Sequence, residues 1–461
     1  MKEQFLLQRK KLNQFKNTTS RERIKKLEEL KDVVTEMRSQ LKEALFLDFK
    51  KPHAETDLTE VLPSISSINF LITHLDAWMK DLKVKGSPLL LGTTSFVRYE
   101  PRGQVLVISP WNYPITLSLI PVAEAFAAGN GIVLKPSEFT PHTNRLLKEI
   151  FSRVFKNDEV LFIEGDAQTS TELLTYPFHH IFFTGSTHVG KIVMEAASKT
   201  LASVTLELGG KSPCIIDSDV NLEDCVRKII WGKLVNGGQT CIAPDYVLVP
   251  ESKLSKFLEL SVKVIKEVYA DESNIAHIIS SKHHQRLKSL IDDALKEGAE
   301  LICGHTYKEG SNYFAPTILL KPSLESRVMK EEIFGPILPV LTYKESIEAV
   351  NLVNTYERPL ALYVFSDNDS KLDYFLGNII SGGVALNDVI LHISNHHLPF
   401  GGINQSGIGN YHGEYGFKTF SHERAVLKRN LNLGVDYFYP PYTKTKESLI
   451  DSVFKKLSRF L

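Results

Sequence analysis

The 461-residue chain contains little cysteine and has no excess of positive or negative charge. Its four cysteines, Cys214, Cys225, Cys241 and Cys303, form no CxxC pair, so the sequence supports neither a disulfide framework nor a structural zinc site. Lysine plus arginine and aspartate plus glutamate number 54 each. This balance gives no reason to expect binding to nucleic acid or to an anionic membrane, and it favours small-molecule chemistry.

The amino terminus lacks the uninterrupted apolar run and the small-residue cleavage site of a secretory signal. Charged residues occur throughout its first thirty positions, so we expect a cytoplasmic protein. The chain also lacks internal repeats and low-complexity segments, so no solenoid is implied. Its apolar content of 43% is ample for the cores of the two or three domains that this length predicts.

Up to about residue 85, charged and apolar residues alternate at helical spacing. From about residue 95, short apolar runs alternate with segments of helical length. Strands are expected over residues 103–109, 131–135, 159–165, 179–185 and 203–208. Helices are expected over residues 115–129, 140–155, 167–176 and 187–199. Continuous apolar strands that alternate with helices predict a parallel, doubly wound sheet of the α/β class.

A second series of strands and helices predicts a second α/β domain from about residue 208 to 387. It begins with a helix over residues 221–236, capped by Asp219 or Asn221 and stopped by the Gly-Gly pair that follows. Further elements are expected over residues 246–250, 281–298, 361–366 and 382–388.

Ligands of parallel α/β sheets bind at the carboxyl ends of the strands. The segments that follow the expected strands are PWNYP at 110–114, KPSE at 135–138, GSTHVG at 185–190 and GGKSP at 209–213. We therefore expect the site in these four loops. GSTHVG does not match the GxGxxG fingerprint of dinucleotide-binding folds.

One thiol and one carboxylate each lie beside a glycine pair, which permits close approach of the backbone. Cys241 in GGQTC follows Glu207 in ELGGK by 34 residues. The two side chains fit a nucleophile and a general base at a domain boundary. They also fit a packed thiol and an ordinary carboxylate at a strand end, and these residues alone do not decide between the two interpretations.

The chain resembles the aldehyde dehydrogenase superfamily in seven segments. They are SPWNYP, KPSE, FTGST, ELGGKSP, GQTC, EEIFGPILPV and PFGGINQSGIG. These segments have the family's order and spacing over about residues 100–425. Residues 399–424 are most similar to the class 3 branch, whose members are dimeric and act on fatty and aromatic aldehydes.

The resemblance implies the family's three-part fold and a homodimer. The expected parts are an NAD(P)-binding domain with a doubly wound parallel sheet (1–81 and 99–207), an α/β catalytic domain (208–387), a small bridging or oligomerisation element (82–98 and 388–425) and a carboxyl-terminal tail (426–461).

The resemblance also implies the catalytic residues. Cys241 would attack the aldehyde carbonyl to form a thiohemiacetal, and loss of hydride would leave a thioester. The Asn112 amide and the backbone N–H of Cys241 would hold the oxyanion. Glu207 would activate the water that hydrolyses the thioester, and its burial predicts a raised pKa. Because Cys241 follows the end of a helix, no helix amino terminus stabilises its thiolate. Activation would instead depend on the positive nicotinamide of the bound cofactor, on local backbone N–H groups, or on proton transfer through water to Glu207, and the sequence does not decide between them.

For the cofactor, the resemblance implies NAD, with NADP also possible. Lys135 and Glu138 would contact the adenosine ribose, where a carboxylate accepts from the 2′-OH and repels a 2′-phosphate. The remaining cofactor contacts would be Trp111, Gly185 and Ser186 at the pyrophosphate, Glu332 at the nicotinamide ribose and Phe334 near the ring.

The family uses no metal, although His392, His396 and His397 lie close together in the sequence. No carboxylate or thiol completes a known ligand spacing around them. We therefore expect loop or subunit-contact residues here. Phe400 fits the wall of a substrate funnel or the core equally well.

Residues 448–461 place apolar side chains on one helical stripe. The stripe consists of Leu449, Ile450, Val453, Phe454, Leu457 and Leu461. This segment is too short to span a bilayer. We expect it to dock on protein, either this chain or a neighbouring subunit, and rank peripheral membrane contact second.

Two alternatives differ in chemistry or in class. A CoA-acylating or phosphorylating relative would resolve the thioester with another nucleophile, but such relatives commonly lack a base at the position of Glu207. A scaffold protein would keep the fold without activity, but Asn112, Glu207, Cys241 and Glu332 are all present. Both observations favour hydrolytic aldehyde oxidation.

Overall fold

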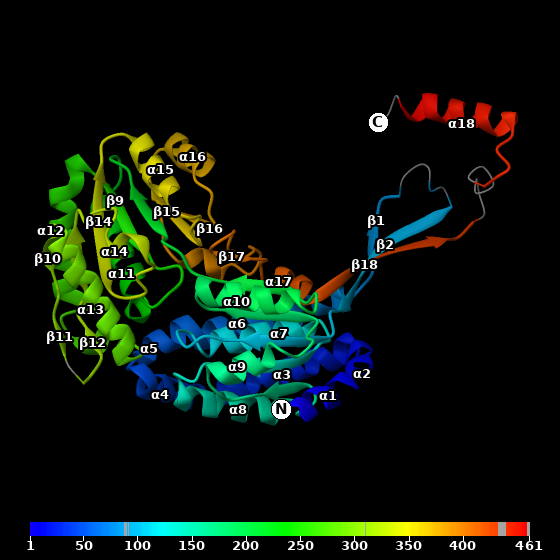
Figure 1. Ribbon diagram of the computed structural model, residues 1–461, viewed down its shortest axis with the longest axis horizontal. Helices are drawn as coiled ribbons and strands as arrows, with labels where there is room; N and C mark the ends of the chain where they lie inside the picture. Colours follow the sequence, from blue (N-terminus) through cyan, green and yellow to red (C-terminus); the bar gives the residue numbers. More distant parts are fainter. Residues whose placement is uncertain (87–89, 91, 309, 432–438, 459–461) are drawn as a thin grey trace.

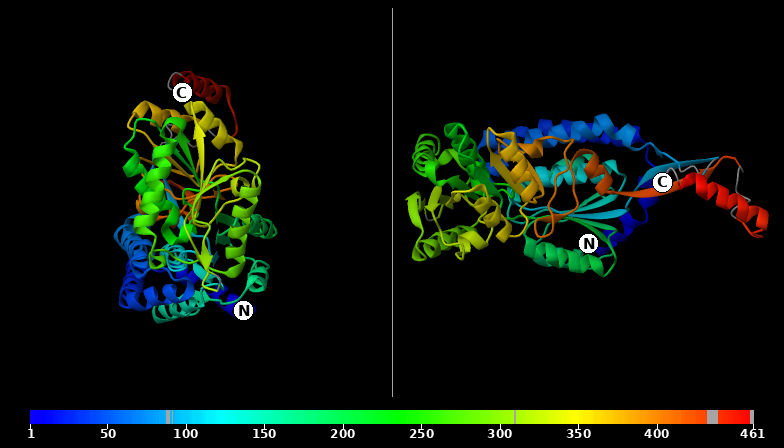
Figure 2. Two further views of the ribbon diagram at one scale, coloured as in Figure 1. Left: turned by 90° about the vertical axis from the view of Figure 1, so that its left-hand side faces the viewer. Right: turned by 90° about the horizontal axis from the view of Figure 1, so that it is seen from above.

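The computed structural model describes residues 1–86, 90, 92–308, 310–431 and 439–458. Two large, mostly parallel sheets and their helices form the body of the molecule, and a three-stranded antiparallel sheet projects from it (Figure 1). The last helix lies near the far end of this projection in Figure 1 and in the right-hand view of Figure 2. The expected α/β class is confirmed.

The amino-terminal region forms helices, as its periodicity predicts. They are α1 (Lys2–Arg9), α2 (Leu12–Lys16), α3 (Ser20–Glu36), α4 (Arg38–Phe49), α5 (His53–Thr56) and α6 (Leu62–Trp78), with a π-helical segment at Asp57–Val61. Thr19 and Glu22 form a capping box at the start of α3, in which the Glu22 carboxylate accepts from the Thr19 N–H at 2.7 Å. Helix α3 packs against α6.

The first large sheet has the strand order β17-β7-β6-β3-β4-β5. Its strands are β3 (Gln104–Ile108), β4 (Gly131–Lys135), β5 (Val160–Phe162), β6 (His180–Thr184), β7 (Ser203–Glu207) and β17 (Gly407–Ile408). Only β17 is antiparallel to its neighbour. The connecting helices are α7 (Thr116–Ala127), α8 (Pro141–Val154), α9 (Ala167–Leu173) and α10 (Thr187–Ser198). All five strands and four helices expected between residues 103 and 208 are confirmed.

Alternate residues of the first sheet belong to two different cores. Val105 and Val107 of β3 pack in the core that includes α7 and α8, whereas Leu106 and Ile108 pack in a second core with Val193 of α10. A strand covered on both faces needs apolar residues at every position. This explains the continuous apolar runs of the sequence.

The second large sheet has the order β10-β13-β14-β9-β8-β15-β16 and is parallel except at β10. Its strands are β8 (Pro213–Ile216), β9 (Tyr246–Pro250), β10 (Glu300–Cys303), β13 (Thr317–Leu320), β14 (Ile337–Tyr343), β15 (Ala361–Phe365) and β16 (Gly383–Leu386). Its helices are α11 (Leu222–Leu234), α12 (Leu254–Val268), α13 (Ser281–Lys296), α14 (Arg327–Lys330), α15 (Ser346–Thr355) and α16 (Asp369–Asn378). A separate antiparallel pair is formed by β11 (Tyr307–Lys308) and β12 (Tyr313–Phe314).

Helix α11 begins as the sequence predicts but ends earlier. At its start, Asn221 is the cap of the two expected, because its side chain accepts from two N–H groups of the first turn. The helix ends at Leu234, before the glycine pair. Asn236 already has a left-handed conformation with φ of 57°, as has Gly237 with φ of 62°. Asparagine tolerates this conformation, so the helix stops earlier than a glycine-based prediction places it.

The projecting sheet has the order β1-β2-β18. Its strands are β1 (Leu82–Val84), β2 (Thr93–Pro101) and β18 (Ser421–Arg429), and α17 (Gly413–Thr419) precedes β18. Two boundaries differ from those expected for the bridging element. β17 lies within 388–425 yet pairs with β7 in the first sheet, and β18 continues past residue 425 because it pairs with β2 along its whole length. Residues 87–89 and 91 of the expected hairpin lie outside the described residues.

Helix α18 (Lys444–Leu457) stands apart from the body (Figures 1 and 2). Four apolar side chains of the expected stripe are exposed: Leu449, Ile450, Val453 and Phe454. The Leu457 side chain and Leu461 lie outside what the structure describes. Within the described ranges, no helix combines the length and apolar character needed to cross a membrane.

Candidate active site

The three residues expected to carry the chemistry come from both large sheets. Asn112 follows β3, Glu207 ends β7, and Cys241 follows a 3₁₀ turn at Val235–Gly238. The Asn112 side chain donates to the Gln239 carbonyl in the loop of Cys241 at 3.1 Å, and the Glu207 carboxyl group lies close enough to Cys241 to raise the pKa of its thiol. The fold therefore brings together side chains that are far apart in the sequence.

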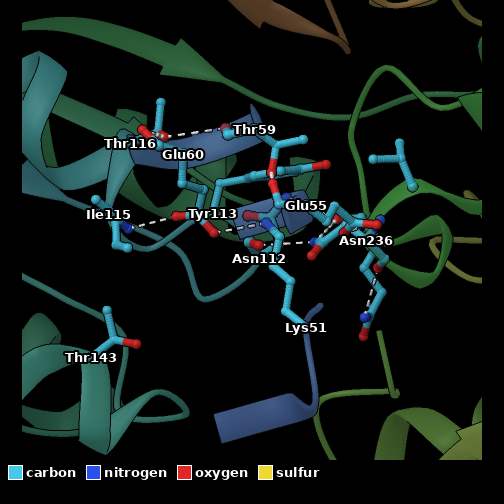
Figure 3. A network of polar contacts seen from close by, with 12 residues as sticks. Lys51, Glu55, Thr59, Glu60, Asn112, Tyr113, Ile115, Thr116, Thr143 and Asn236 are labelled. Carbon is cyan, nitrogen blue, oxygen red and sulfur yellow. Dashed lines mark hydrogen bonds and ion pairs between the residues drawn. The ribbon is translucent and has the colours of Figure 1, made fainter. Parts of the chain in front are cut away.

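The Asn112 side chain is bonded to the loop that carries Cys241. Asn112 is buried, and its Nδ2 donates to the Gln239 carbonyl at 3.1 Å. In return, the Asn236 Nδ2 donates to the Asn112 carbonyl at 2.8 Å (Figure 3). An amide nitrogen has two hydrogens, so one remains to face a substrate oxygen.

Gln239 is a structural anchor that sequence reasoning missed. Its Nε2 donates to the carbonyls of Asn236 and His277 at 2.9 and 3.0 Å, and its Oε1 accepts from the Ile279 N–H at 3.0 Å. The side chain is fully buried. The signal in the sequence was a polar residue between a glycine pair and the cysteine, but two of its three partners, His277 and Ile279, lie about forty residues downstream.

The surroundings of Cys241 favour the neutral thiol. Burial raises its pKa to about 12, and the carboxyl groups of Glu332 and Glu207 act in the same direction. The backbone N–H groups of Cys241 and Ile242 oppose this shift. The expectation that no helix amino terminus helps the thiolate agrees with the position of Cys241 after α11. The thiolate therefore needs stabilisation or proton transfer that the preceding helix does not supply.

Glu207 is a buried carboxyl group with the character expected of a general base. Neither carboxyl oxygen has a hydrogen-bond partner among the described residues. Burial raises its pKa well above the ordinary value, and Glu124 adds to this shift, so the expectation of a raised pKa is confirmed. Glu124 was not predicted; it lies inside the apolar α7 and is itself fully buried.

Two of the expected cofactor residues form an ion pair at the end of β4. The buried Lys135 Nζ lies 3.1 Å from Glu138 Oε2, and the Glu138 side chain is 40% exposed. A lysine and a carboxylate arranged in this way offer a donor and an acceptor to a pair of hydroxyl groups.

Ser186 caps α10, accepting from the Val189 N–H at 3.4 Å. This twelve-residue helix begins directly after β6, and the N–H groups of its first turn carry a partial positive charge, which suits a phosphate. A Cβ added at Gly185 would lie 2.5 Å from the Phe183 ring. The close packing of this loop therefore requires glycine.

Glu332 lies against the glycine pair that follows Glu207. A Cβ added at Gly209 would lie 2.1 Å from Glu332 Oε2, so only glycine leaves room for this carboxyl group. Burial raises the Glu332 pKa to about 8, Asp245 adds to the shift, and the Gly210 N–H opposes it. Glu332 Oε1 has no hydrogen-bond partner among the described residues.

Phe334 and Trp111 lie next to each other, with ring centroids 5.4 Å apart in an edge-to-face arrangement. Phe334 has a φ of 49°, which is unusual for a bulky residue. Glu332 has a carboxyl oxygen without a partner among the described residues, Gly209 leaves space beside this carboxyl group, and α10 begins close by in the sequence after Gly185. Together with Trp111 and Phe334, these groups fit a dinucleotide cofactor, which contains a sugar, a diphosphate and a flat ring.

The three histidines pack against other side chains. His396 Nε2 lies 2.9 Å from Ser66 Oγ, and the His397 ring is 4.9 Å from Phe70 of α6. Phe400 is buried and stacks on His412, which favours the core over a funnel wall. No group of three or more His, Cys, Asp or Glu side chains in the described part of the chain is arranged to hold a metal ion.

A thiol, an amide and a buried carboxyl group thus meet between two doubly wound sheets, beside loops that fit a dinucleotide. The fold and the site define an α/β oxidoreductase with a cysteine at its centre. The sequence matches the model of the aldehyde dehydrogenase family over residues 7–426, and the chain belongs to this family. It is an oxidoreductase that acts on aldehydes, and the family uses NAD or NADP as cofactor.

Similar proteins agree with this membership. The chain is 41% identical to "Aldehyde dehydrogenase, dimeric NADP-preferring" of Canis lupus familiaris, over 91% of this chain and 93% of that protein. It is also 41% identical to "Aldehyde dehydrogenase family 3 member A2" of Rattus norvegicus, over 92% and 88% of the two chains. The solved structure "Substrate bound state of Staphylococcus Aureus AldH" superposes with a TM-score of 0.94 at 36% identity, covering 98% of this chain and 99% of that one. The resemblance to the class 3 branch is therefore confirmed.

Proposed function

We propose that the chain oxidises an aldehyde to its carboxylic acid with NAD(P), through a thiohemiacetal and a thioester on Cys241 that water hydrolyses. The observation that best supports this proposal is the convergence of Cys241, Asn112 and the unpartnered Glu207 carboxyl group. We retain the division into an NAD(P)-binding domain and a catalytic domain around the two large sheets.

In the first half-reaction, Cys241 Sγ attacks the carbonyl carbon. Its proton is lost as the thiolate forms, with help from the positive charge of the bound cofactor, from the backbone N–H groups of Cys241 and Ile242, or by transfer through water to Glu207, which releases the proton before it acts again. Asn112 Nδ2 and the Cys241 N–H donate to the oxygen on which negative charge develops. Donors of this kind contribute about 3 to 4 kcal/mol each.

When bound, the cofactor's nicotinamide accepts the hydride from the former aldehyde carbon. The adenosine ribose would be held by Lys135 and Glu138, the pyrophosphate by Trp111, Gly185 and Ser186, and the nicotinamide ribose by Glu332, with Phe334 near the ring. NAD is the favoured cofactor because Glu138 repels a 2′-phosphate, and NADP remains a possible cofactor.

In the second half-reaction, Glu207 takes a proton from the water that attacks the thioester. The Cys241 sulfur leaves as thiolate, and the carboxylic acid is released. A carboxylate with a raised pKa is a stronger base than an ordinary one, which suits this step near neutral pH.

The proposed substrates are medium or long aliphatic aldehydes and aromatic aldehydes. This assignment rests on the class 3 resemblance and is tested by steady-state assays across such a panel with both cofactors.

The hydrolytic chemistry is tested by the product. With NAD or NADP and an aldehyde, the purified chain should form the free acid at the same rate with and without coenzyme A. Turnover that depends on coenzyme A would establish the acylating alternative, and no oxidation of any aldehyde in the panel would favour the scaffold.

We further propose a cytoplasmic homodimer. One of the relatives is described as dimeric, and β18 and β16 each end a sheet, with an outer edge that pairs with no strand in the described residues. Light scattering should give about twice the chain mass of 52.0 kDa. A mass of one chain would contradict the proposal.

We propose that α18 docks on a neighbouring subunit, and we rank peripheral membrane contact second. Sedimentation with liposomes compares the full chain with a chain truncated at Lys446. The two chains should partition equally between liposomes and solution. Liposome binding by the full chain alone would favour membrane contact over docking on a subunit.

A further inference from the structure

A network of buried and half-buried polar side chains joins the segment between α4 and α6 to Asn112 and Asn236 (Figure 3). Its members are Lys51, Glu55, Glu60, Tyr113, Asn236 and Thr240. We call this network the brace. Lys51, Glu55 and Glu60 come from the segment between α4 and α6, which lies outside the two catalytic loops, those that carry Asn112 and Cys241.

The first contact of the brace is an ion pair between two completely buried side chains. Lys51 Nζ lies 2.8 Å from Glu60 Oε1, and neither side chain is exposed to solvent. Glu60 Oε2 accepts from the Ile115 N–H at 2.9 Å, three residues after Asn112. A buried pair of this kind is costly to break on one side only, because the remaining charge has no solvent. The Asn112 loop is therefore tied to the amino-terminal helices.

The second contact connects the two catalytic loops. Lys51 Nζ lies 4.1 Å from the centroid of the Tyr113 ring, a cation–π distance. The Tyr113 hydroxyl lies 2.6 Å from Thr240 Oγ1. Tyr113 is the residue after Asn112, and Thr240 is the residue before Cys241. One hydrogen bond thus joins the neighbours of the oxyanion donor and of the thiol.

A third contact supports the loop that carries Cys241, through Asn236. Glu55 Oε1 accepts from the Asn236 N–H at 2.9 Å, and the Asn236 Nδ2 donates to the carbonyls of Asn112 and Gln239. Burial raises the Glu55 pKa, and the charge of Lys51 opposes this shift. Lys51 therefore lies near both carboxyl groups of the brace.

We propose that Lys51, Glu60, Tyr113 and Thr240 are positioning residues, which set the distance between the Asn112 amide and the Cys241 thiol through the Tyr113–Thr240 hydrogen bond. This inference rests on the proposed function of Asn112 and Cys241. Attack on a carbonyl and capture of its oxygen require both groups to be placed within a fraction of an ångström. Lys51 and Glu60 are completely buried and act through Tyr113 and the Ile115 N–H, so their loss should lower kcat and leave KM close to its original value.

The test compares Tyr113→Phe with a matched control, Tyr343→Phe. Tyr343 is buried, and its hydroxyl donates to the Ile216 carbonyl at 2.6 Å in the second sheet. Both variants lose one hydrogen bond of a tyrosine hydroxyl. The rate constant of the burst of reduced cofactor should fall about tenfold or more in Tyr113→Phe and stay unchanged in Tyr343→Phe. Equal burst rates in the two variants would overturn the proposal.

Thr240 provides the other half of the same bond. Thr240→Val should slow the burst to a similar extent, and the Tyr113→Phe/Thr240→Val double variant should be no slower than either single one, because both remove one interaction. Thr240→Ser keeps the hydroxyl and should restore the burst. Additive losses, or no rescue by serine, would contradict the inference.

A second measurement needs neither aldehyde nor cofactor. Iodoacetamide alkylation of Cys241, followed on its peptide by mass spectrometry across pH, reports the position and the protonation of the thiol. Lys51→Met/Glu60→Gln, which removes both buried charges together, and Tyr113→Phe should each shift the pH profile relative to Tyr343→Phe. Profiles identical to that of the unaltered chain would overturn the proposal.

Failure of the inference is distinct from failure of the proposed function. The positioning role of the brace alone would be rejected if the unaltered chain shows a burst, Cys241→Ala shows none, and the brace variants show an unchanged burst. Absence of a burst from the unaltered chain with every aldehyde would remove the proposed function.

Discussion

The two sides of the site differ in how well their polar groups are bonded. On the side of the nucleophile, Asn112, Gln239 and Thr240 are buried and each makes hydrogen bonds within the protein. On the side of the base and the cofactor, Glu207 and Glu332 hold carboxyl oxygens without partners among the described residues, and the pKa of each is raised.

This contrast separates groups that hold a geometry from groups that receive a ligand or a proton. Unsatisfied buried polar groups are costly, and most proteins keep few of them. They persist where chemistry uses them, since a carboxyl group with a raised pKa exchanges protons near neutral pH. The hydrogen bonds of Asn112, Gln239 and Thr240 therefore fix the position of the thiol's loop, whereas the carboxyl groups of Glu207 and Glu332 are free to exchange protons or to bind a ligand.

The largest effect is expected from the thiol between the two sides. Cys241→Ala should abolish dehydrogenase turnover and leave cofactor binding intact, because only the nucleophile is lost. Cys303→Ala is the control, since Cys303 is also partly exposed but lies on β10, and it should retain full activity. Steady-state assays measure the turnover of both variants, and cofactor titration measures their cofactor binding. Substantial activity in Cys241→Ala would remove the nucleophile assignment.

Glu207→Gln tests the side of the base and the cofactor. Steady turnover should fall by about 10² to 10⁴, the contribution typical of a general base, while the burst of reduced cofactor is retained if deacylation becomes limiting. Stopped-flow absorbance separates the two phases. Loss of the burst as well would show that thiol activation is the main task of Glu207.

Gln239→Leu tests the side of the nucleophile. The change removes three buried hydrogen bonds to the backbone, although the Asn236 carbonyl keeps its bond from the Gln239 N–H, so the free energy of unfolding should fall by about 3 kcal/mol. Urea unfolding measures this loss. Unchanged stability would mean that the loop is held without Gln239.

Glu332 predicts a pH dependence of stability. Its pKa of about 8 in the folded protein exceeds the ordinary value of 4.5, so the folded state binds the proton more tightly. The free energy of unfolding should therefore fall as the pH rises from about 4.5 to about 8. Glu332→Gln should flatten this slope in thermal melts, and an unaltered slope would contradict the assigned shift.

The smallest effect concerns cofactor choice. Glu138→Gln removes the charge that repels a 2′-phosphate, so kcat/KM with NADP should improve relative to NAD by about tenfold, which corresponds to about 1.4 kcal/mol. The ratio of the two specificity constants is the measurement. An unchanged ratio would place the discrimination elsewhere.

The sequence predicted the first sheet well because its strands are buried on both faces and its helices are amphipathic. It located Cys241, Glu207 and Asn112 because each lies in a segment that resembles the family. It did not predict β8, β10, β13 and β14, or the helices α12, α15 and α16. Gln239, Glu124 and the brace were also missed, since each acts through partners distant in the sequence, and periodicity carries no information about such contacts.

The end of α11 shows a further limit. Glycine is the usual residue at a helix end, yet Asn236 takes the left-handed conformation first, with its N–H bonded to Glu55 from the amino-terminal region. A tertiary contact sets this boundary, so local sequence rules place it two residues too late.

The central claim is that the substrate becomes a thioester on Cys241 that Glu207 resolves. The most direct test mixes the Glu207→Gln variant with NAD and an aldehyde, quenches with acid and measures the mass of the peptide that contains Cys241. This peptide should carry the acyl group of the aldehyde, and the unaltered chain should accumulate far less of it. An unmodified Cys241 in a variant that still reduces NAD, or an acyl group on another residue, would contradict the claim.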